Sequence, residues 1–331
     1  MTSIARRRLG QTELMLTELG LGTAGLGNLY RPVDPEAAEA TLEAAWTSGI
    51  RFFDTAPFYG FGLAERRLGD FLRGKSPGAA ILATKVGRLL KPVAWDRIPD
   101  HGYVDTLPFA PEFDYSYDGV MRSVEDSYAR LGLNRIDIAW VHDIGRYTHG
   151  DAHQHHMDAL LSGGLRALQR LKEGGAIAAF GIGVNEVAVC LEVMERAPID
   201  AILLAGRYSL LDRSAAARLL PLCAERGVSL VVGGVFNSGI LATGAVPGAR
   251  FDYAPAGADV IATVNALSAV AARHGVPLAA AALQFPLRDR TVASMLIGAA
   301  STAELTRNLQ ALSVAIPPAV WPEFVPLDLP S

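Results

Sequence analysis

Short apolar stretches alternate with longer amphipathic stretches along nearly the whole chain, and this alternation constrains the fold most strongly. The apolar stretches have no polar face, which is typical of parallel strands covered on both sides. About eight strand-helix units in 331 residues predict one α/β domain over residues 1–331, a closed (β/α)8 TIM barrel. The expected strands are Leu19–Thr23, Ile50–Asp54, Ala80–Lys85, Ile136–His142, Ile177–Gly183, Ala201–Ala205, Val228–Gly233 and Val292–Ile297.

The amphipathic stretches between these strands predict helices, and the first has a clear start signal. Asp34 before Pro35 fits an N-cap followed by proline at the first helical position. The expected helices are Pro35–Ser48, Ala64–Arg73, Asp118–Leu131, Gly164–Glu173, Glu186–Arg196, Ser214–Glu225, Asp259–His274 and Thr302–Ser313.

Three connections are longer than the others, and each of them follows a predicted strand. They are Val86–Tyr117, Asp143–Leu161 and Gly234–Ala258. In a barrel they lie on the C-terminal face, where active sites are built. The segment Arg8–Thr17 precedes the first strand and is expected to form a hairpin that closes the other end.

One glycine-rich segment matches a dinucleotide-binding motif. Gly20–Gly25 fits G-x-G-x-x-G after a strand, and Asp54 could stand for the ribose-binding acid. However, Asn28–Val33 separates the motif from the first helix, and the acid lies farther along the chain than is usual. We therefore interpret the segment as a turn after the first barrel strand and disfavour a doubly wound sheet.

Charge and hydropathy exclude several kinds of partner. A formal net charge of -4 gives no electrostatic reason to bind nucleic acid. Arg6–Arg8 is not followed by the apolar run of a signal peptide, and no apolar run reaches the roughly 18 residues of a membrane span. Cys190 and Cys223 fit free thiols in a reducing compartment. We expect a soluble cytoplasmic protein, either a monomer or a small homo-oligomer.

Polar side chains stand at or just beyond the ends of three neighbouring predicted strands. Asp54 ends the second strand and Tyr59 follows in its loop, while Lys85 and His142 end the third and fourth. Singly, each group has an ordinary structural explanation, such as an ion pair or a hydrogen-bonded core histidine. Because strand ends meet at one face of a barrel, the four together indicate an active site.

The four groups suit proton exchange with an alcohol or carbonyl oxygen. A free tyrosine has a pKa of about 10. We expect the Lys85 ammonium, held by Asp54, to lower the pKa of Tyr59, and His142 to hydrogen-bond the reacting oxygen. Hydride transfer to or from a nicotinamide cofactor is the natural partner reaction.

The sequence resembles the aldo-keto reductase superfamily over nearly its whole length. The resemblance assigns the family's catalytic tetrad to Asp54, Tyr59, Lys85 and His142. The segments "LLAGRYSLLD" and "GGVFNSGILATG" most resemble those of the branch that contains L-fucose and D-threo-aldose 1-dehydrogenases, with pyridoxal 4-dehydrogenase nearby. Other segments that carry the likeness are "RRLGQTELMLTELGLGT", "FFDTAPFYG", "ATKVG", "IDIAWVHD", "GGAIAAFGIGVNE" and "LIGAASTAELTRNLQAL".

The resemblance also implies a set of cofactor contacts. Tyr208 would stack on the nicotinamide, Asn185 would hold its carboxamide, Phe236–Leu241 would meet the pyrophosphate, and Asn308 would touch the adenine. The full set of expected cofactor-binding residues is Gly22, Thr23, Asn185, Tyr208, Phe236, Ser238, Gly239, Leu241, Gly298, Ala300, Glu304, Arg307 and Asn308.

Departures from the family pattern favour NAD over NADP. Val184 and Ala205 stand where many relatives have serine and glutamine, so the carboxamide has fewer side-chain partners. Ala300 stands where relatives that prefer NADPH often have arginine, and Glu304 would repel a 2′-phosphate but can accept hydrogen bonds from a ribose diol. Arg307 lies close enough in sequence to weaken this inference.

The resemblance implies an oxidoreductase that oxidises the anomeric hydroxyl of an aldose to a lactone. Two other enzymes stay open, a pyridoxal 4-dehydrogenase and an NADPH-dependent aldehyde or ketone reductase. A cofactor-sensing binding subunit is a further alternative, although a sensor need not keep all four tetrad groups. The expected partner is a small sugar or aldehyde substrate.

Two further clusters admit more than one interpretation. His149, His153, His155 and His156 could suggest a metal, but we predict a solvated loop and no metal site. A set of aromatic residues could either line the substrate opening or pack the first long loop onto the barrel. These aromatics are Phe58, Phe61, Trp95, Phe109, Tyr115 and Tyr117.

Overall fold

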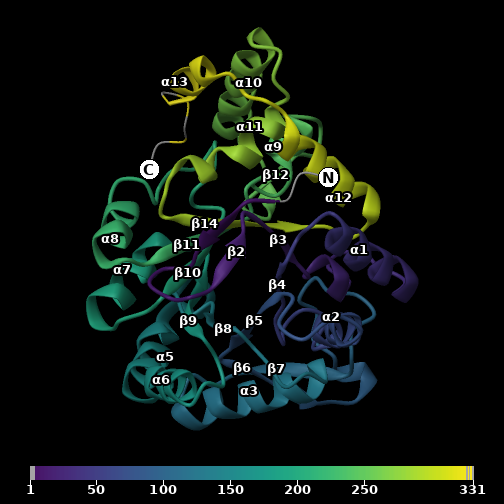
Figure 1. Cartoon of the computed structure of the whole chain (residues 1–331), viewed down its shortest axis with the longest axis vertical. Coiled ribbons are helices and arrows are strands. Elements are labelled where there is room, and N and C mark those ends of the chain that lie inside the picture. Colours follow the sequence, from purple (N-terminus) through teal and green to yellow (C-terminus); the bar gives the residue numbers. More distant parts are fainter. Residues whose placement is uncertain (1–3, 326, 328, 330–331) are drawn as a thin grey trace.

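The computed structural model describes residues 4–325, 327 and 329, and it confirms the predicted barrel (Figure 1). The eight barrel strands are β3 (Leu19–Gly22), β4 (Phe52–Asp54), β5 (Ile81–Val86), β8 (Ile138–His142), β9 (Ala179–Val184), β10 (Ala201–Ala205), β11 (Ser229–Gly233) and β14 (Val292–Gly298). They close in the order β10-β11-β14-β3-β4-β5-β8-β9, and neighbouring strands pair in parallel. Each lies within a few residues of its predicted position, so the doubly wound alternative is wrong.

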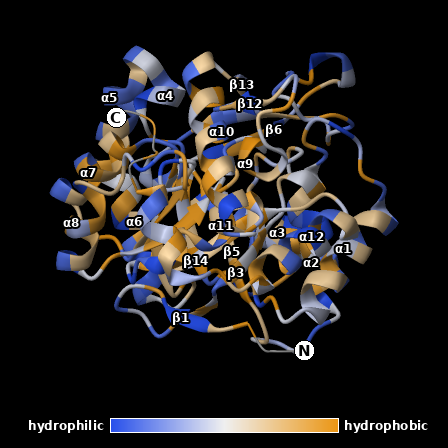
Figure 2. Ribbon diagram, turned by 90° about the horizontal axis from the view of Figure 1, so that it is seen from above, coloured by the Kyte–Doolittle hydropathy of each residue, from blue (hydrophilic) through white to orange (hydrophobic). Residues whose placement is uncertain are grey.

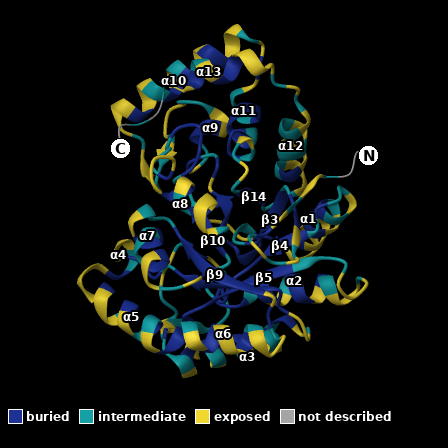
Figure 3. Cartoon of the chain, turned by 60° about the vertical axis from the view of Figure 1, so that its left-hand side comes forward, coloured by how far each residue is buried: buried dark blue, intermediate teal, exposed yellow. Residues whose placement is uncertain are grey.

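Helices surround the barrel and turn their buried faces inward (Figure 3). In α3, Val120, Val124 and Leu131 are buried at helical spacing, while Arg122 and Glu125 on the other face are exposed. The main outer helices are α1 (Pro35–Thr47), α2 (Leu63–Arg73), α3 (Tyr117–Leu131), α6 (Leu165–Glu173), α7 (Val187–Arg196), α8 (Leu219–Arg226), α10 (Ala258–Arg273), α11 (Leu278–Gln284) and α12 (Thr302–Ser313).

Three details of the helices differ from the sequence predictions. Asp34 occupies the N-cap of α1, but its side chain makes no capping hydrogen bond. The helix expected from Ser214 begins only at Leu219, because the Asp212 carboxylate accepts hydrogen bonds from Ser214 and holds a turn there. The alanine-rich α11 was not expected.

The two ends of the barrel are built differently. At the N-terminal end, the predicted hairpin forms from β1 (Arg6–Arg8) and β2 (Met15–Thr17). Leu9 and Leu16 of this hairpin are fully buried against the barrel interior, in one cluster with Phe52 and Trp140. The Arg7 guanidinium donates to the backbone oxygens of Leu287, Asp289 and Val292, near the start of β14. The hairpin therefore closes the N-terminal end of the barrel, whose apolar interior is coloured orange in Figure 2.

The three long connections lie at the opposite end and carry short elements of their own. The first contains the antiparallel pair β6 (Arg88–Pro92) and β7 (Phe109–Phe113). The second contains α4 (Arg146–His149) and α5 (His153–Ala159), and the third contains α9 (Ile240–Thr243), β12 (Arg250–Phe251) and β13 (Ala254–Pro255). A last short helix, α13 (Trp321–Phe324), packs near α10 (Figure 1).

Within the described part of the chain, no single helix meets the length and apolarity needed to span a membrane. The pair α10 and α11 meets both together, but the two helices are bent by 101° relative to each other.

Candidate active site

The predicted tetrad lies on three adjacent strands, which we call the reacting arc: β4, β5 and β8. Asp54 is the last residue of β4, Lys85 lies near the end of β5, and His142 is the last residue of β8. Tyr59 follows β4 in a turn whose backbone N–H bonds to the carbonyl of Ala56. Parallel pairing brings the carboxyl ends of these strands together, so residues far apart in sequence meet at one mouth.

The Asp54 carboxylate and the Lys85 ammonium form an enclosed ion pair. Lys85 Nζ lies 2.5 Å from Asp54 Oδ1, and the two side chains are 3% and 1% exposed. Lys85 Nζ also donates to the carbonyl of Thr55 at 2.9 Å, and Trp140 Nε1 donates to Asp54 Oδ2 at 3.0 Å. Burial raises the pKa of Asp54, and Lys85 opposes that rise. Both charged groups are held in fixed positions before any ligand binds.

The phenol of Tyr59 lies beside this pair, and Lys85 Nζ is 4.6 Å from the centroid of its ring. Removal from water raises the pKa of Tyr59 well above its ordinary value, and the carboxylates of Asp54 and Asp143 raise it further. The expectation that Lys85 depresses the pKa of Tyr59 is therefore wrong for the free protein, because desolvation outweighs the ammonium that Asp54 already pairs. The phenol is protonated at neutral pH.

The glycine-rich turn after β3 packs closely against the backbone of Tyr59. A Cβ atom on Gly27 would lie 2.7 Å from the carbonyl carbon of Tyr59, so only glycine permits this close approach. The turn continues as a short 3-10 helix over Gly25–Gly27 and not as a long helix.

His142 faces the phenol from the other side of the mouth. The rings of His142 and Tyr59 lie 6.0 Å apart, nearly perpendicular at 86°. Burial, Arg88 and Lys85 hold the pKa of His142 well below its ordinary value, so the imidazole is neutral. Its Nε2 lies 3.4 Å from Asp143 Oδ2, and its Nδ1 is buried without a hydrogen-bond partner.

Two charged residues that the sequence analysis did not single out adjoin the tetrad. Arg88 follows Lys85 by three residues, Asp143 follows His142 directly, and the two side chains form an ion pair. The guanidinium also lies 4.0 Å from the ring centroid of Phe58. Both Arg88 and Asp143 could have been found in the sequence by including the three residues that follow each strand-end tetrad residue.

The expected cofactor contacts lie around the remaining five strands, which we call the cofactor arc: β9, β10, β11, β14 and β3. Most of these residues are at least partly exposed at the mouth or on α12, namely Asn185, Phe236, Ser238, Gly239, Gly298, Ala300, Glu304, Arg307 and Asn308. A Cβ atom added to Gly239 or Gly298 would meet no other atom within 4 Å. The open backbone at these two glycines fits close approach of a nucleotide.

Comparisons with known proteins identify the family of the chain. Residues 18–327 match the Aldo/keto reductase family. The chain belongs to this family. A pyridoxal 4-dehydrogenase from Microbacterium luteolum is 50% identical over 326 residues, which cover 96% of this chain and 95% of that protein. A D-threo-aldose 1-dehydrogenase from a Pseudomonas species is 38% identical, with 94% of each chain covered.

The structural likeness extends over the whole barrel. An aldo-keto reductase from Bacillus halodurans, solved in its holo form, superposes with a TM-score of 0.77 at 27% identity, covering 98% of this chain and 96% of that one. Members of the aldo/keto reductase family are oxidoreductases that use nicotinamide nucleotides.

Four of the expected cofactor-binding residues are buried in the structure of this chain. Tyr208 is only 7% exposed, its ring packs against Phe285 at 5.4 Å, and burial raises its pKa to about 12. Its stacking on the nicotinamide stays a prediction. Thr23 Oγ1 donates to the carbonyl of Asp54, so this side chain supports the tetrad. Gly22 and Leu241 are also enclosed.

Glu304 is already paired on both carboxylate oxygens. Its Oε1 lies 2.6 Å from Nη2 of Arg31, and its Oε2 accepts from the backbone N–H of Ala300 at 2.8 Å. Ser301 caps α12 by accepting from the backbone of Glu304. Both carboxylate oxygens are therefore engaged, which leaves fewer free lone pairs for a ribose diol than the sequence suggested.

The histidine-rich connection is only partly the solvated loop that we predicted. His149 and His153 are buried, at 9% and 1% exposed. His149 Nε2 shares a hydrogen bond with the Tyr115 hydroxyl, which in turn donates to the carbonyl of His142. Burial, with His156 and Arg88 nearby, lowers the pKa of His149 to about 4. Among the described residues, no three His, Cys, Asp or Glu side chains form a group suited to a metal ion.

The aromatic residues divide between the two interpretations. Phe58 lies 6.1 Å from the His142 ring and 5.4 Å from the ring of Tyr103, so it lines the mouth. Trp95 is 73% exposed, whereas Tyr115 is buried against His149. Tyr103, whose ring stacks 6.3 Å from Tyr59, was not anticipated.

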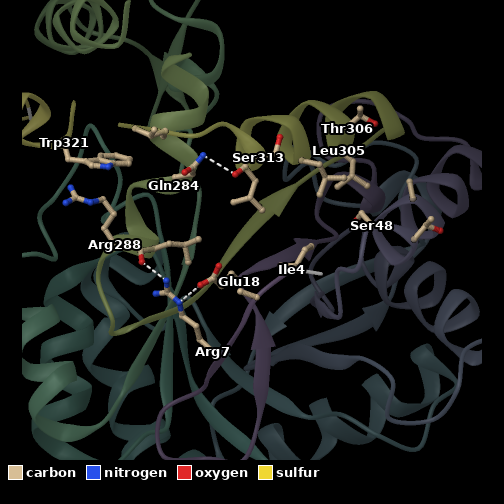
Figure 4. Close-up of a pocket in the computed structure, with 17 residues that line it drawn as sticks. Ile4, Arg7, Glu18, Ser48, Gln284, Arg288, Leu305, Thr306, Ser313 and Trp321 are labelled. Carbon is tan, nitrogen blue, oxygen red and sulfur yellow. Dashed lines mark hydrogen bonds and ion pairs between the residues drawn. The ribbon is translucent and has the colours of Figure 1, made fainter. Parts of the chain in front are cut away.

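A cavity of about 870 Å³ lies at the N-terminal end of the barrel, away from the tetrad (Figure 4). Its walls come from the hairpin, α1, α11 and α12, and they include the ion pair of Arg7 with Glu18 at 2.7 Å. None of the predicted site residues lines this cavity. The cavity is therefore separate from the predicted active site.

Proposed function

We propose that this protein oxidises a cyclic hemiacetal to a lactone, with NAD⁺ as the hydride acceptor. The observation that carries the proposal is the enclosed Asp54–Lys85 pair beside the phenol of Tyr59 and the neutral His142. These groups handle the proton of a hydroxyl or carbonyl oxygen, and they offer no activated nucleophile for acyl or phosphoryl transfer.

Each tetrad residue has a distinct role in this proposal. The nicotinamide, when bound, supplies the two-electron chemistry as hydride acceptor or donor. The Tyr59 phenol exchanges the proton of the substrate hydroxyl, and the neutral His142 hydrogen-bonds and orients the same oxygen. Lys85, held by Asp54, places a positive charge beside the phenol and favours tyrosinate as it forms. Since the phenol is protonated in the free protein, oxidation should accelerate as the pH rises.

The preferred substrate is pyridoxal, and an aldose is the second candidate. The aldehyde of pyridoxal and its neighbouring hydroxymethyl group can close into a cyclic hemiacetal, as an aldose does, so one reaction type covers both. The 50% identity with a pyridoxal 4-dehydrogenase, against 38% with the D-threo-aldose enzyme, changes the order suggested by the sequence alone. The aromatic wall of Phe58 and Tyr103 also suits a flat ring.

The preference for NAD⁺ rests on the negative charge at the rim of the cofactor arc. Glu304 would repel a 2′-phosphate, and Arg31 is engaged by that carboxylate. Ala300 brings no positive charge of its own.

A substrate screen tests the proposed function. Purified protein is mixed with NAD⁺ or NADP⁺ and with pyridoxal, L-fucose or other aldoses, and reduced nicotinamide is followed at 340 nm. We expect turnover of pyridoxal with NAD⁺ and a lactone product by mass spectrometry. No turnover of any hemiacetal would sink the dehydrogenase proposal and leave a binding subunit, and a clear NADP⁺ preference would sink the cofactor assignment.

A further inference from the structure

The ion pair of Arg88 and Asp143 is the strongest unexplained feature beside the tetrad. Arg88 begins β6 immediately after Gly87, and Asp143 directly follows His142 at the end of β8. Nη2 of Arg88 donates to Oδ2 of Asp143, and the same oxygen lies 3.4 Å from Nε2 of His142. The pair therefore extends the polar surface of the reacting arc by one step beyond the histidine.

Stability alone does not account for this pair. Burying two charges carries a desolvation cost, and apolar residues of the same size are often as stable or more stable. Arg88 is only 6% exposed. Neither its Nε nor the Nδ1 of His142 has a hydrogen-bond partner. Asp143 adopts a left-handed backbone at φ 50°, which is uncommon for a residue other than glycine. Several costs concentrated at one place are typical of a functional site.

The pair is also partly exposed, and its charges affect the pKa values of the reacting groups. The Asp143 side chain keeps 24% of its surface exposed. Besides burial, Arg88 lowers the pKa of His142, while Asp143 raises that of Tyr59. A ligand oxygen near His142 is therefore within the electrostatic reach of both charges.

We propose that Arg88 and Asp143 bind a substrate hydroxyl one or two carbons from the reacting carbon, and so select hydroxylated substrates over plain aldehydes. This proposal rests on the proposed function. The guanidinium donates and the carboxylate accepts, which matches a neighbouring hydroxyl that can do both. That oxygen is the ring hydroxyl two carbons from the aldehyde carbon in a 3-hydroxypyridine-4-carbaldehyde, or the hydroxyl on the carbon next to the anomeric carbon in an aldose. Phe58, stacked on Arg88 at 4.0 Å, supplies the flat wall against which the ring lies.

Substrates that differ by one hydroxyl test the proposal. One pair is 3-hydroxypyridine-4-carbaldehyde and pyridine-4-carbaldehyde, reduced with NADH; the other is arabinose and 2-deoxyribose, oxidised with NAD⁺. For Arg88→Met we expect kcat/KM to fall about 10- to 100-fold for the hydroxylated member, as for loss of a charged hydrogen bond, and less than about threefold for the other. Asp143→Asn should show the same selective loss and is the second variant if Arg88→Met does not fold.

Lys91→Met is the matched control, because Lys91 lies on the same strand and pairs with Glu112 at the surface. It should leave both substrates unchanged. Equal losses for both members of a pair in Arg88→Met and Asp143→Asn would overturn the assignment and leave a purely structural role. Absence of turnover by the unaltered protein with every one of these substrates would overturn the proposed function and this inference with it.

Discussion

The reacting arc and the cofactor arc share one barrel mouth but present different parts of the chain to it. In the reacting arc side chains supply the predicted reacting groups, and Asp54 is held by hydrogen bonds from Lys85 and Trp140. In the cofactor arc several side chains are occupied inside the scaffold: Thr23 bonds to the Asp54 carbonyl, and Asn237 Oδ1 accepts from Ser209. The open groups there include the backbone at Gly239 and Gly298. We therefore expect side chains to specify the chemistry and backbone groups to make many of the nucleotide contacts.

The largest test of this contrast removes one oxygen from the reacting arc. Tyr59→Phe should lower turnover by about 10²–10⁴ while leaving the Kd for NADH nearly unchanged, because the phenol exchanges a proton and the cofactor is held elsewhere. Steady-state kinetics and fluorescence titration measure the two quantities. Tyr103→Phe is the control, since its ring stacks 6.3 Å from Tyr59. Near-normal turnover by Tyr59→Phe would refute the assigned role.

The second test removes the ammonium from the enclosed ion pair. Lys85→Met leaves the buried Asp54 carboxylate without its partner and should lower the free energy of unfolding by about 3–5 kcal/mol. Lys91→Met breaks an exposed pair and should cost at most about 1 kcal/mol. Urea unfolding of both variants provides the comparison. Equal costs would mean that the reacting arc is no more rigidly held than the surface.

The fold and the reacting arc could be predicted from the sequence far better than the cofactor arc. Strand periodicity located all eight strands, and the residue types at their ends identified Asp54, Lys85 and His142. The burial of Tyr208 against Phe285 could not be anticipated, because it depends on packing between segments far apart in the chain. The direction of the Tyr59 pKa failed for a similar reason, since desolvation depends on everything that surrounds the phenol.

A smaller effect concerns acid sensitivity. The pKa of His149 is about 4 in the folded protein and about 6.5 unfolded, so between these pH values only the unfolded chain takes up the proton. The free energy of unfolding should fall as the pH drops through this window, by at most about 1.4 kcal/mol per pH unit for this residue. His149→Gln should make that decrease shallower in urea midpoints measured from pH 7.5 to 4.5. An unchanged slope would assign the sensitivity to other groups, His142 in the reacting arc among them.

The smallest expected effect lies at the rim of the cofactor arc. Glu304→Gln removes the anion and frees Arg31 from its ion pair, so kcat/KM with NADP⁺ should rise several-fold relative to NAD⁺. Glu13→Gln, an exposed residue of the hairpin loop, is the control. A ratio that does not move would show that the side chains of this arc do not set the cofactor preference.

The seal beneath the barrel has a consequence for synthesis of the chain. The side chain of Arg7 reaches backbone oxygens at Leu287, Asp289 and Val292, at least 280 positions later. A ribosome must therefore deliver almost the entire polypeptide before the hairpin can find its final partners. Until then the barrel interior that buries Leu9 and Leu16 is incomplete, and the hairpin cannot close the N-terminal end of the barrel.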